Sequence, residues 1–577
     1  MEQVKDRRWQ LRKFDHEVAA ALSGNLGISA LHSGVLSARG FVTATDAKQY
    51  LSPDLADLGD PFHLKGMEEA VTRVIQAYER GETVCIHGDY DVDGITSVAL
   101  LAGFFSAVGV KCVYVIPRRL EEGYGLSTDG VDEAIRLGAS LLITVDCGIT
   151  SVKEALYCRQ QGVDLIVTDH HTPSESLPAA VAVINPLQPG CNSTFKKLAG
   201  VGLALKLAMA VRSRMRGNGF FEGMAEPNLR EYLDLAALGT IADLVPLQGE
   251  NRIIAVAGLR QLAQSKRAGI IALKKVSLVE KTVSAGDVGF RLAPRLNAAG
   301  RLDDAKRGVE LLLSSDPEAS EALADELDAG NRERQEIERE ILADALKKLD
   351  SDTSMEGRRS IVMASDKWHP GVIGIVASRL VELYYRPTIL IALQDGRGRG
   401  SGRSINSFHL YDALSCASRN LIKFGGHSQA AGLEISEDSI GAFYDEFDSC
   451  ALKIAHDDLT PAISIDAEVA PEEVTDELIR IKDSMSPYGI GNPEPLFLLR
   501  GAEVVEARLL KDAHLKLKLR SGDRVYDGIG FRMADKMIAS GKVDLVFVAE
   551  KNVWKGRESL QLKIRDIRRS GGAIGEV

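Results

Sequence analysis

Residues 87–94, with the sequence HGDYDVDG, place four ionisable groups within seven positions, namely His87, Asp89, Asp91 and Asp93. Carboxylates this close together repel one another and take up protons unless a cation keeps them ionised, so a bound metal is the simplest explanation. The segment follows the apolar run TVCI, and alternation in an extended chain would direct the four groups to one side. An EF-hand-like calcium loop or an Asp-rich turn is the alternative.

Further acidic and imidazole side chains come directly after apolar runs. Asp146 ends LLITVD, the triplet Asp169–His171 ends LIVTDHH, and Asp243 lies in LGTIADLVPL. Alone, Asp146 would also suit the cap of a following helix. Adjacent histidines are rarely needed for packing, and imidazole nitrogen beside carboxylate oxygen suits Mn²⁺ or a related ion better than calcium. We predict that six residues hold two divalent cations, with one bridging carboxylate: His87, Asp91, Asp93, Asp146, His170 and Asp243.

The elements between residue 83 and about residue 245 must bring these groups together. Short runs rich in β-branched residues alternate there with amphipathic stretches, which is typical of a parallel sheet covered by helices on both faces. In such a doubly wound α/β domain, ligands bind at the carboxyl ends of the strands. The candidate groups up to His171 follow predicted strands, so we expect them to converge at one edge of the sheet.

The rest of the chain changes character several times. Residues 316–350 are rich in Ala, Leu, Glu and Arg, which predicts one long helix or two abutting ones. A smaller α/β pattern follows, and the last hundred or so residues alternate in short polar strands like an OB-like β-barrel. The predicted organisation is an N-terminal helical lead-in (1–60), the first α/β domain (61–315), the connecting helix (316–350), the second α/β domain (351–457) and the barrel (458–577).

Length, charge and cysteine content limit the class of protein. A chain of 577 residues exceeds what one hydrophobic core supports. No apolar stretch resembles a secretory signal or a membrane span, and the seven cysteines form no CxxC pair, so we expect a soluble protein of the reducing cytoplasm. The net charge of −11 disfavours a nucleic-acid partner, but residues 396–427 and 551–569 are locally basic. Solvated faces would explain these two stretches equally well.

The motifs HGDYDVDG, TVDCG, TDHH and LGTIADLVPL resemble those of the DHH phosphoesterase family. Within it, the chain is similar to the RecJ exonucleases over nearly its whole length, through strings such as APRLNAAGRLDD, WHPGVIGIVASRL, GSGRS and PYGIGNPEPLF. The resemblance implies a DHH domain, a long helix, a DHH-associated (DHHA1) domain and an OB-like barrel, in that order. Cys147 stands where related enzymes often have Asn, and we interpret it as a buried thiol without a catalytic role.

The resemblance also implies a function. We expect a single-stranded-DNA-specific 5′→3′ exonuclease that releases 5′-mononucleotides by two-metal phosphodiester hydrolysis, with Mn²⁺ or Mg²⁺, in DNA recombination and repair. The implied partners are single-strand-binding protein, a RecQ-type helicase and mismatch-repair factors, and we expect a monomer that does not bind membranes. A small-substrate DHH phosphatase and a non-catalytic scaffold are the alternative functions.

Roles for the remaining site residues are likewise implied by the resemblance. Arginines would face substrate phosphates because a guanidinium is a planar donor that keeps its charge, although surface salt bridges would also explain them; these are Arg119, Arg295 and Arg301. A 5′-phosphate pocket would contain Ser401 and Arg403. Residues expected beside the reacting groups are His171, Asn297 and His427. Asp89 is expected to orient His87 or a bound water.

Overall fold

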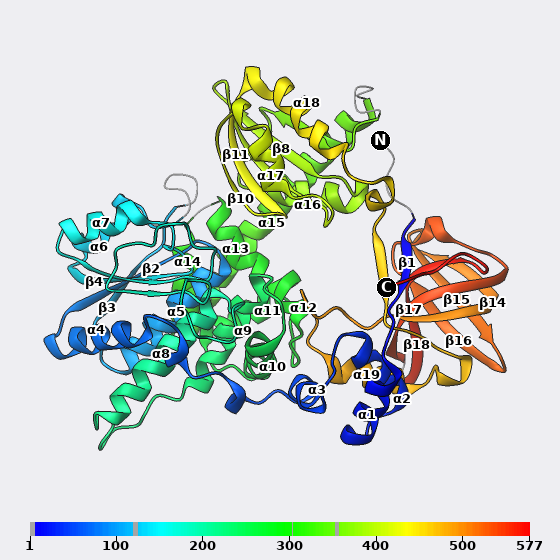
Figure 1. The fold of residues 1–577 in the computed structure, drawn as a ribbon, viewed down its shortest axis with the longest axis horizontal. Coiled ribbons are helices and arrows are strands. Elements are labelled where there is room, and N and C mark those ends of the chain that lie inside the picture. Colours follow the sequence, from blue (N-terminus) through cyan, green and yellow to red (C-terminus); the bar gives the residue numbers. More distant parts are fainter. Residues whose placement is uncertain (1–5, 119–124, 303, 352–356, 555) are drawn as a thin grey trace. The chain divides into compact units, whose positions relative to one another are not determined.

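The structure, a computed structural model, describes residues 6–118, 125–302, 304–351, 357–554 and 556–577 (Figure 1). The chain divides into two compact units. The larger unit comprises Thr45–Asn331 together with the distant segment Asp483–Glu494. The smaller unit comprises Met1–Ala44, Arg332–Lys482 and Pro495–Val577. The segment Asp483–Glu494 thus packs with the larger unit although it lies far from the rest of that unit in the sequence, and the predicted domain bounds stay a prediction.

The larger unit is built on a five-stranded parallel sheet in the order β3-β2-β4-β5-β6. Its strands are β2 (Thr83–Gly88), β3 (Cys112–Val115), β4 (Ala139–Val145), β5 (Asp164–Thr168) and β6 (Ala182–Ile184). The chain leaves β2 for β3 on one side and returns to β4 on the other, so the strand order reverses between β2 and β4. In open α/β sheets this reversal opens a crevice at the carboxyl ends of the strands.

Helices cover both faces of this sheet, as the apolar pattern predicted. Val84 and Ile86 face a large core shared with α4 (Met67–Arg80), α5 (Val92–Ala107) and α8 (Gly200–Gly217). On the opposite face, Cys85 and Leu142 pack with α6 (Thr128–Arg136) and α7 (Val152–Gln160). The helix α5 has almost no exposed side chain, which is typical of a helix that is apolar on all sides. The doubly wound α/β fold is confirmed.

Further helical elements of the larger unit include α9 (Leu233–Ala242), α10 (Gly249–Ala263), α11 (Ala268–Val276), α12 (Ala285–Asp287), η4 (Val288–Leu292), α13 (Ala293–Leu302) and α14 (Lys306–Leu313). The predicted long connection is one continuous helix, α15 (Pro317–Ser351), which begins at a proline. Within the described ranges, no helix has both the length and the apolar composition needed to cross a bilayer.

The smaller unit contains a mixed five-stranded sheet in the order β10-β11-β9-β8-β7. Its strands are β7 (Ile361–Ser365), β8 (Thr388–Gln394), β9 (Arg397–Arg403), β10 (Leu421–Gly426) and β11 (Ala430–Ser436). Only β7 and β8 pair in parallel, across the helix α16 (Ile373–Tyr384). The helices α17 (Leu410–Cys416) and α18 (Ile440–Ala451) pack beside the sheet. This is the second α/β arrangement that the sequence predicted.

The carboxyl-terminal strands close into a five-stranded barrel, because β14 pairs with β15 on one side and with β17 on the other. The barrel strands are β14 (Phe497–Leu510), β15 (His514–Ser521), β16 (Arg524–Gly530), β17 (Gly541–Trp554) and β18 (Arg557–Arg569). The helix α19 (Asp476–Met485) precedes the barrel, as do β12 (Ala462–Ile465) and β13 (Ala467–Glu468). The OB-like barrel is confirmed, and β14 is a strand that the sequence analysis did not recognise.

The amino-terminal residues form α1 (His16–Leu26), α2 (Ala30–Ala38) and α3 (Ala44–Leu51), in keeping with a helical lead-in. They also contain β1 (Arg8–Leu11), which pairs with β12 and with β19 (Gly575–Glu576) near the other end of the chain. Trp9 of this strand is buried and donates from Nε1 to Asp566 at 2.9 Å. Sequence periodicity missed β1 because both of its pairing partners lie hundreds of residues away.

Candidate metal centre

The HGDYDVDG segment turns directly from β2 into α5. Asp91 caps this helix, since its Oδ1 accepts hydrogen bonds from the backbone N of Asp93 at 2.9 Å and of Gly94 at 3.1 Å. A Cβ on Gly94 would lie 2.3 Å from the carbonyl oxygen of Asp89, so the tight turn requires glycine. The expectation that the four ionisable groups alternate along an extended chain was wrong, because Asp93 lies in the first helical turn.

Asp93 is held by the start of α8. Its carboxylate accepts hydrogen bonds from Gly200 N at 2.6 Å and from Val201 N at 2.8 Å. Amide groups at a helix amino terminus stabilise negative charge. Burial and the nearby Asp91 nevertheless raise the pKa of Asp93 to about 7. The backbone hydrogen bonds therefore fix the position of the carboxylate but do not fully stabilise its negative charge.

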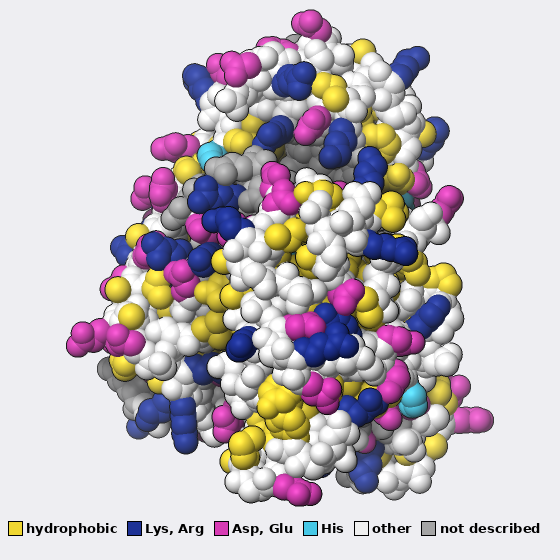
Figure 2. Space-filling view, turned by 90° about the vertical axis from the view of Figure 1, so that its left-hand side faces the viewer, with side chains coloured by type: hydrophobic (Ala, Val, Ile, Leu, Met, Phe, Trp, Pro, Cys, Tyr) yellow, Lys and Arg dark blue, Asp and Glu magenta, His cyan; other side chains and the backbone are white. Residues whose placement is uncertain are grey.

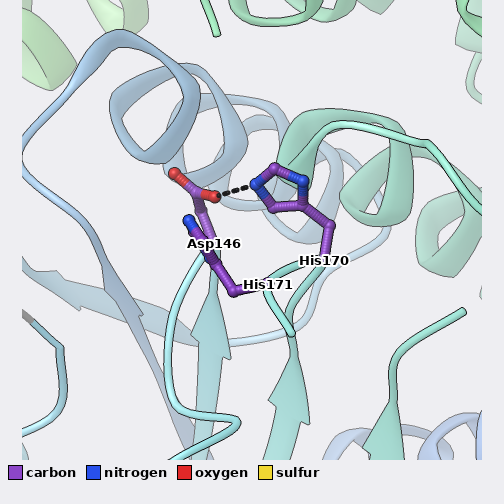
Figure 3. A group of neighbouring side chains, drawn as sticks. All are labelled: Asp146, His170 and His171. Atoms are coloured by element: carbon purple, nitrogen blue, oxygen red, sulfur yellow. Dashed lines mark ion pairs between the residues drawn. The ribbon is translucent and has the colours of Figure 1, made fainter. Parts of the chain in front are cut away.

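Asp146 and His170 come from the ends of the neighbouring strands β4 and β5 (Figure 3). His170 Nε2 lies 3.1 Å from Asp146 Oδ1, 3.6 Å from Asp243 Oδ2 and 4.0 Å from Asp93 Oδ2. Asp146 has a φ of 62°, a left-handed conformation that a residue other than glycine rarely adopts. Strained backbone of this kind is concentrated at functional sites. Parallel pairing of the strands thus brings together groups that are 24 residues apart or more.

Asp243 reaches the same place from a helix. It directly follows the last residue of α9 as the carboxyl-terminal cap, and its backbone N donates to Gly239 O at 2.9 Å. Burial, followed by repulsion from neighbouring carboxylates, raises the pKa of both Asp146 and Asp243 well above the ordinary value. Several carboxyl groups with raised pKa values lie in one buried region, and a bound cation would stabilise their ionised form.

The donor atoms fit divalent cations. Three groups of side chains have ligand atoms within 4.8 Å of one another: Asp146, His170 and His171; Asp93, His170 and Asp243; and Asp89, Asp91 and Asp146. Two buried atoms, His87 Nε2 and Asp243 Oδ2, have no hydrogen-bond partner among the residues that the structure describes. Oxygen and imidazole donors in this proportion suit Mn²⁺, Mg²⁺ or a related ion. The groups overlap, since Asp146 and His170 each belong to two of them, and the predicted number of ions stays a prediction.

His87 is fully buried and belongs to none of the three groups. Burial lowers the pKa of His87 to about 4, so the imidazole is neutral, which is the form that binds metals. Cys147 Sγ lies 3.8 Å from His87 Nδ1. On the other side, a Cβ added to Gly130 of α6 would lie 2.8 Å from His87 Nε2. The imidazole is thus confined from two sides, and its role as a ligand stays a prediction.

Asp169, to which the sequence analysis assigned no role, organises the loops around His171. Its Oδ1 accepts from His171 N at 3.0 Å and lies 2.7 Å from His171 Nδ1, while Oδ2 accepts from Ile149 N at 2.9 Å. Burial opposes ionisation, but these hydrogen bonds outweigh it, lowering the pKa of Asp169 and raising that of His171. A carboxylate that fixes a neighbouring imidazole is common around metal sites, and its place in the DHH triplet was the available signal.

The helix α13 carries three of the expected residues. Asn297 Oδ1 accepts a hydrogen bond from Val92 N at 3.2 Å, so this side chain contacts the start of α5. Arg295 is engaged by the protein itself: Nε donates to Asp328 Oδ1 at 2.9 Å, and the other guanidinium nitrogens donate to backbone oxygens. Arg301 lies on the same helix and is partly exposed. Binding of a phosphate by Arg295 would require it to leave these partners, and its phosphate-binding role stays a prediction.

The remaining expected residues lie in the smaller unit. Ser401 and Arg403 are on β9, where Arg403 donates to Ser401 Oγ at 3.3 Å. A Cβ on Gly374 of α16 would lie 2.7 Å from Ser401 Oγ, so the first turn of this helix closely approaches the pair. His427 is exposed in the turn between β10 and β11. Arg119 lies outside the described residues.

Comparisons with known proteins agree with this arrangement. Three family models match: the DHH family N-terminal domain at residues 83–240, the DHHA1 domain at 358–453 and the RecJ OB domain at 465–566. The single-stranded-DNA-specific exonuclease RecJ of Bacillus subtilis is 37% identical over 97% of this chain and 70% of its own length. The chain belongs to the RecJ family. The RecJ exonuclease of Escherichia coli is 40% identical, covering 87% of this chain and 90% of the relative.

RecJ of Thermus thermophilus is similar in structure as well. Its crystal structure in complex with Mn²⁺ gives a TM-score of 0.85 at 32% identity, covering 98% of this chain and 80% of that chain. The complex with Mg²⁺ gives a TM-score of 0.79 at 30% identity, with coverages of 98% and 79%. The predicted RecJ family and the four-part RecJ architecture are therefore both confirmed.

Proposed function

We propose that this RecJ family member is a metal-dependent exonuclease that hydrolyses single-stranded DNA from its 5′ end and releases 5′-mononucleotides. The observation that carries the proposal is the convergence of His170 with three carboxylates at the carboxyl edge of the parallel sheet. Relatives named as single-stranded-DNA-specific exonucleases supply the substrate class. Solved relatives in complex with Mn²⁺ and Mg²⁺ support these ions as cofactors.

Six residues of this chain would hold a pair of divalent cations: His87, Asp91, Asp93, Asp146, His170 and Asp243. Two such ions would lower the pKa of a bound water and stabilise both the attacking and the leaving oxygen of a phosphodiester. The protein contributes fixed geometry, because α8 anchors Asp93 and the strands β4 and β5 present Asp146 and His170. Asp169 keeps His171 oriented beside them, where it would contact a substrate phosphate.

Polarity would come from a 5′-phosphate pocket at β9. Ser401 offers a hydroxyl and Arg403 a permanent positive charge, and both lie against the first turn of α16. Amide groups at a helix amino terminus bind phosphate, and glycine lets the anion approach the backbone closely. A pocket of this chemistry would favour a 5′-phosphorylated end over a 5′-hydroxyl end.

The barrel would hold the single strand away from the reaction site. Figure 2 shows basic and acidic side chains interspersed over one face of the molecule, so charge on this face does not mark the path of a polyanion. The exposed Phe531 is more informative: its ring lies 5.4 Å from that of His514, and Lys563 Nζ lies 6.0 Å from its centroid. An exposed aromatic ring beside a lysine ammonium group is the combination with which OB-folds stack bases and attract phosphates.

The deciding experiment compares substrates on one enzyme preparation with Mn²⁺. We expect release of mononucleotides from 5′-phosphorylated single strands, slow cleavage of duplex, and no turnover of pyrophosphate or a cyclic dinucleotide. Asp146→Ala should abolish cleavage while the protein remains folded by circular dichroism. Preferred hydrolysis of the small substrates would establish the phosphatase alternative, and an inactive wild-type protein would favour the scaffold.

The cellular setting is proposed on family membership. A RecJ exonuclease would act in DNA recombination and repair, with single-strand-binding protein, a RecQ-type helicase and mismatch-repair factors as partners. All seven cysteines are free, which agrees with the reducing cytoplasm in which we expect this enzyme to act as a monomer.

A further inference from the structure

The segment Asp483–Glu494, with the sequence DSMSPYGIGNPE, packs as part of the larger unit although its neighbours in the chain belong to the smaller unit. It includes the last residues of α19 and ends shortly before β14. Twelve residues are too few to form a core of their own. Their conformation is therefore set by what they contact in the larger unit.

A buried polar network gives the segment a fixed shape. Asn492 is almost fully buried and donates from Nδ2 to Met485 O at 2.9 Å and to Pro487 O at 2.8 Å. Tyr50 donates its hydroxyl to Asn492 Oδ1 at 2.7 Å, and Arg252 donates to Met485 O at 3.2 Å. Buried groups with satisfied hydrogen bonds specify one arrangement, because every alternative leaves some of them unpaired. The segment Asp483–Glu494, called the insert below, thus has one defined conformation.

This insert contacts the turn between α9 and α10. The backbone N of Leu247 donates to Ile490 O at 2.8 Å, and Gln248 Nε2 donates to Gly491 O at 2.8 Å. Gly491 has a φ of 72°, and a Cβ there would lie 2.9 Å from Pro246 Cβ. Hydrogen bonds and close packing therefore fix the turn against the insert.

The same turn continues directly from a predicted metal ligand. Asp243 caps the carboxyl end of α9, Leu244 follows with a left-handed φ of 61°, and α10 begins at Gly249 with Gln248 as its cap. Since only a few residues separate the ligand from the contact, displacement of the turn would move the Asp243 carboxylate. Asp243 Oδ2 lies 3.6 Å from His170 Nε2, so even a small movement of the turn would change the distance between these two proposed metal ligands.

We propose that the insert Asp483–Glu494 is a positioning element of the metal centre, which fixes the turn Leu244–Gln248 and thereby the carboxylate of Asp243. The proposal rests on the proposed role of Asp243 as a metal ligand. No residue of the insert belongs to the candidate metal-binding groups among the described residues. The residues of the insert act through the turn, as outer partners do when they orient the ligands of a metal.

The test compares two Gly→Ala variants of the full-length protein. Gly491→Ala adds a Cβ against Pro246, whereas Gly162→Ala adds one at a nearly identical φ of 73° in the same unit, with nothing within 4 Å. Both variants place an alanine at nearly the same left-handed φ, and only Gly491→Ala brings the new Cβ against the turn. Mn²⁺ affinity of the metal-free protein is measured by calorimetry, without reference to nuclease activity.

We expect Gly491→Ala to weaken Mn²⁺ binding roughly tenfold relative to Gly162→Ala, as is typical when the outer support of a ligand is disturbed. Asp243→Asn should weaken it as well, and Gly491→Ala should add little in the Asp243→Asn background. Equal affinities of the two glycine variants, with Asp243→Asn still impaired, would overturn the positioning role alone. Unchanged affinity in Asp243→Asn would overturn both the role and the proposed ligand set.

Discussion

The substitution Asp93→Asn should stabilise the metal-free protein at alkaline pH, although it removes a proposed ligand. Burial and the nearby Asp91 raise the pKa of Asp93 from 3.8 to about 7 in the folded chain. A carboxyl whose pKa is raised on folding contributes its full stability at pH values below its pKa in the unfolded chain. This contribution is lost as the pH rises through its pKa in the folded protein. An amide does not titrate, so the variant escapes this loss.

The size of the effect follows from the two pKa values. A rise from 3.8 to about 7 corresponds to about 4 kcal/mol over the whole pH range. About 2–3 kcal/mol of this falls between about pH 5 and about pH 8. The amide also loses one of the two backbone hydrogen bonds that Gly200 and Val201 donate, which costs about 1–3 kcal/mol at every pH. The hydrogen-bond loss is the same at every pH. Any change between acid and alkaline pH in the free energy of unfolding of the variant, relative to the wild type, therefore reports the titration of Asp93.

The assay must follow the larger unit by itself. Its cysteines Cys85, Cys147 and Cys158 are fully buried, so their labelling by a disulfide reagent in urea, read by mass spectrometry, reports the opening of this unit. With EDTA present, the free energy of unfolding of Asp93→Asn relative to the wild type should rise by about 2–3 kcal/mol between about pH 5 and about pH 8. Asp169→Asn is the contrasting variant and should be less stable at both pH values, because the pKa of Asp169 is lowered. A pH-independent difference for Asp93→Asn would refute the electrostatic argument.

Three further predictions concern metal and DNA. Gly130→Ala places a Cβ against His87 Nε2 and should weaken Mn²⁺ binding roughly tenfold or more in calorimetry, whereas Gly441→Ala, also helical but with open space around it, should not. The pKa values of Asp93, Asp146 and Asp243 are raised, so Mn²⁺ binding at neutral pH should release protons and should become tighter as the pH rises. Proton release is measured as a binding heat that depends on the buffer, and a heat independent of the buffer would contradict this. Phe531→Ala should weaken binding of oligo(dT) roughly tenfold in fluorescence anisotropy, with Phe531→Trp restoring it, and equal affinities would exclude stacking at this ring.

The sequence alone determined the chemistry and much of the architecture. Apolar runs that end in Asp146 and in His170 identify both the strands and the edge at which their side chains meet, because parallel strands share one carboxyl edge. Carboxylate and imidazole side chains by themselves indicated a hard or borderline divalent ion. The long helix, the second α/β pattern and most strands of the barrel were likewise visible as local periodicity.

Contacts between distant residues were decided only by the tertiary structure. That α8 holds Asp93, that Asp169 ties two loops together, and that Arg295 is engaged by Asp328 all depend on which elements become neighbours. Local sequence patterns carry no such information, because the type of a donor residue does not indicate where in the sequence its hydrogen-bond acceptor lies. The strand β1 and the insert Asp483–Glu494 are the clearest cases, because each acquires its structure from partners more than two hundred residues away.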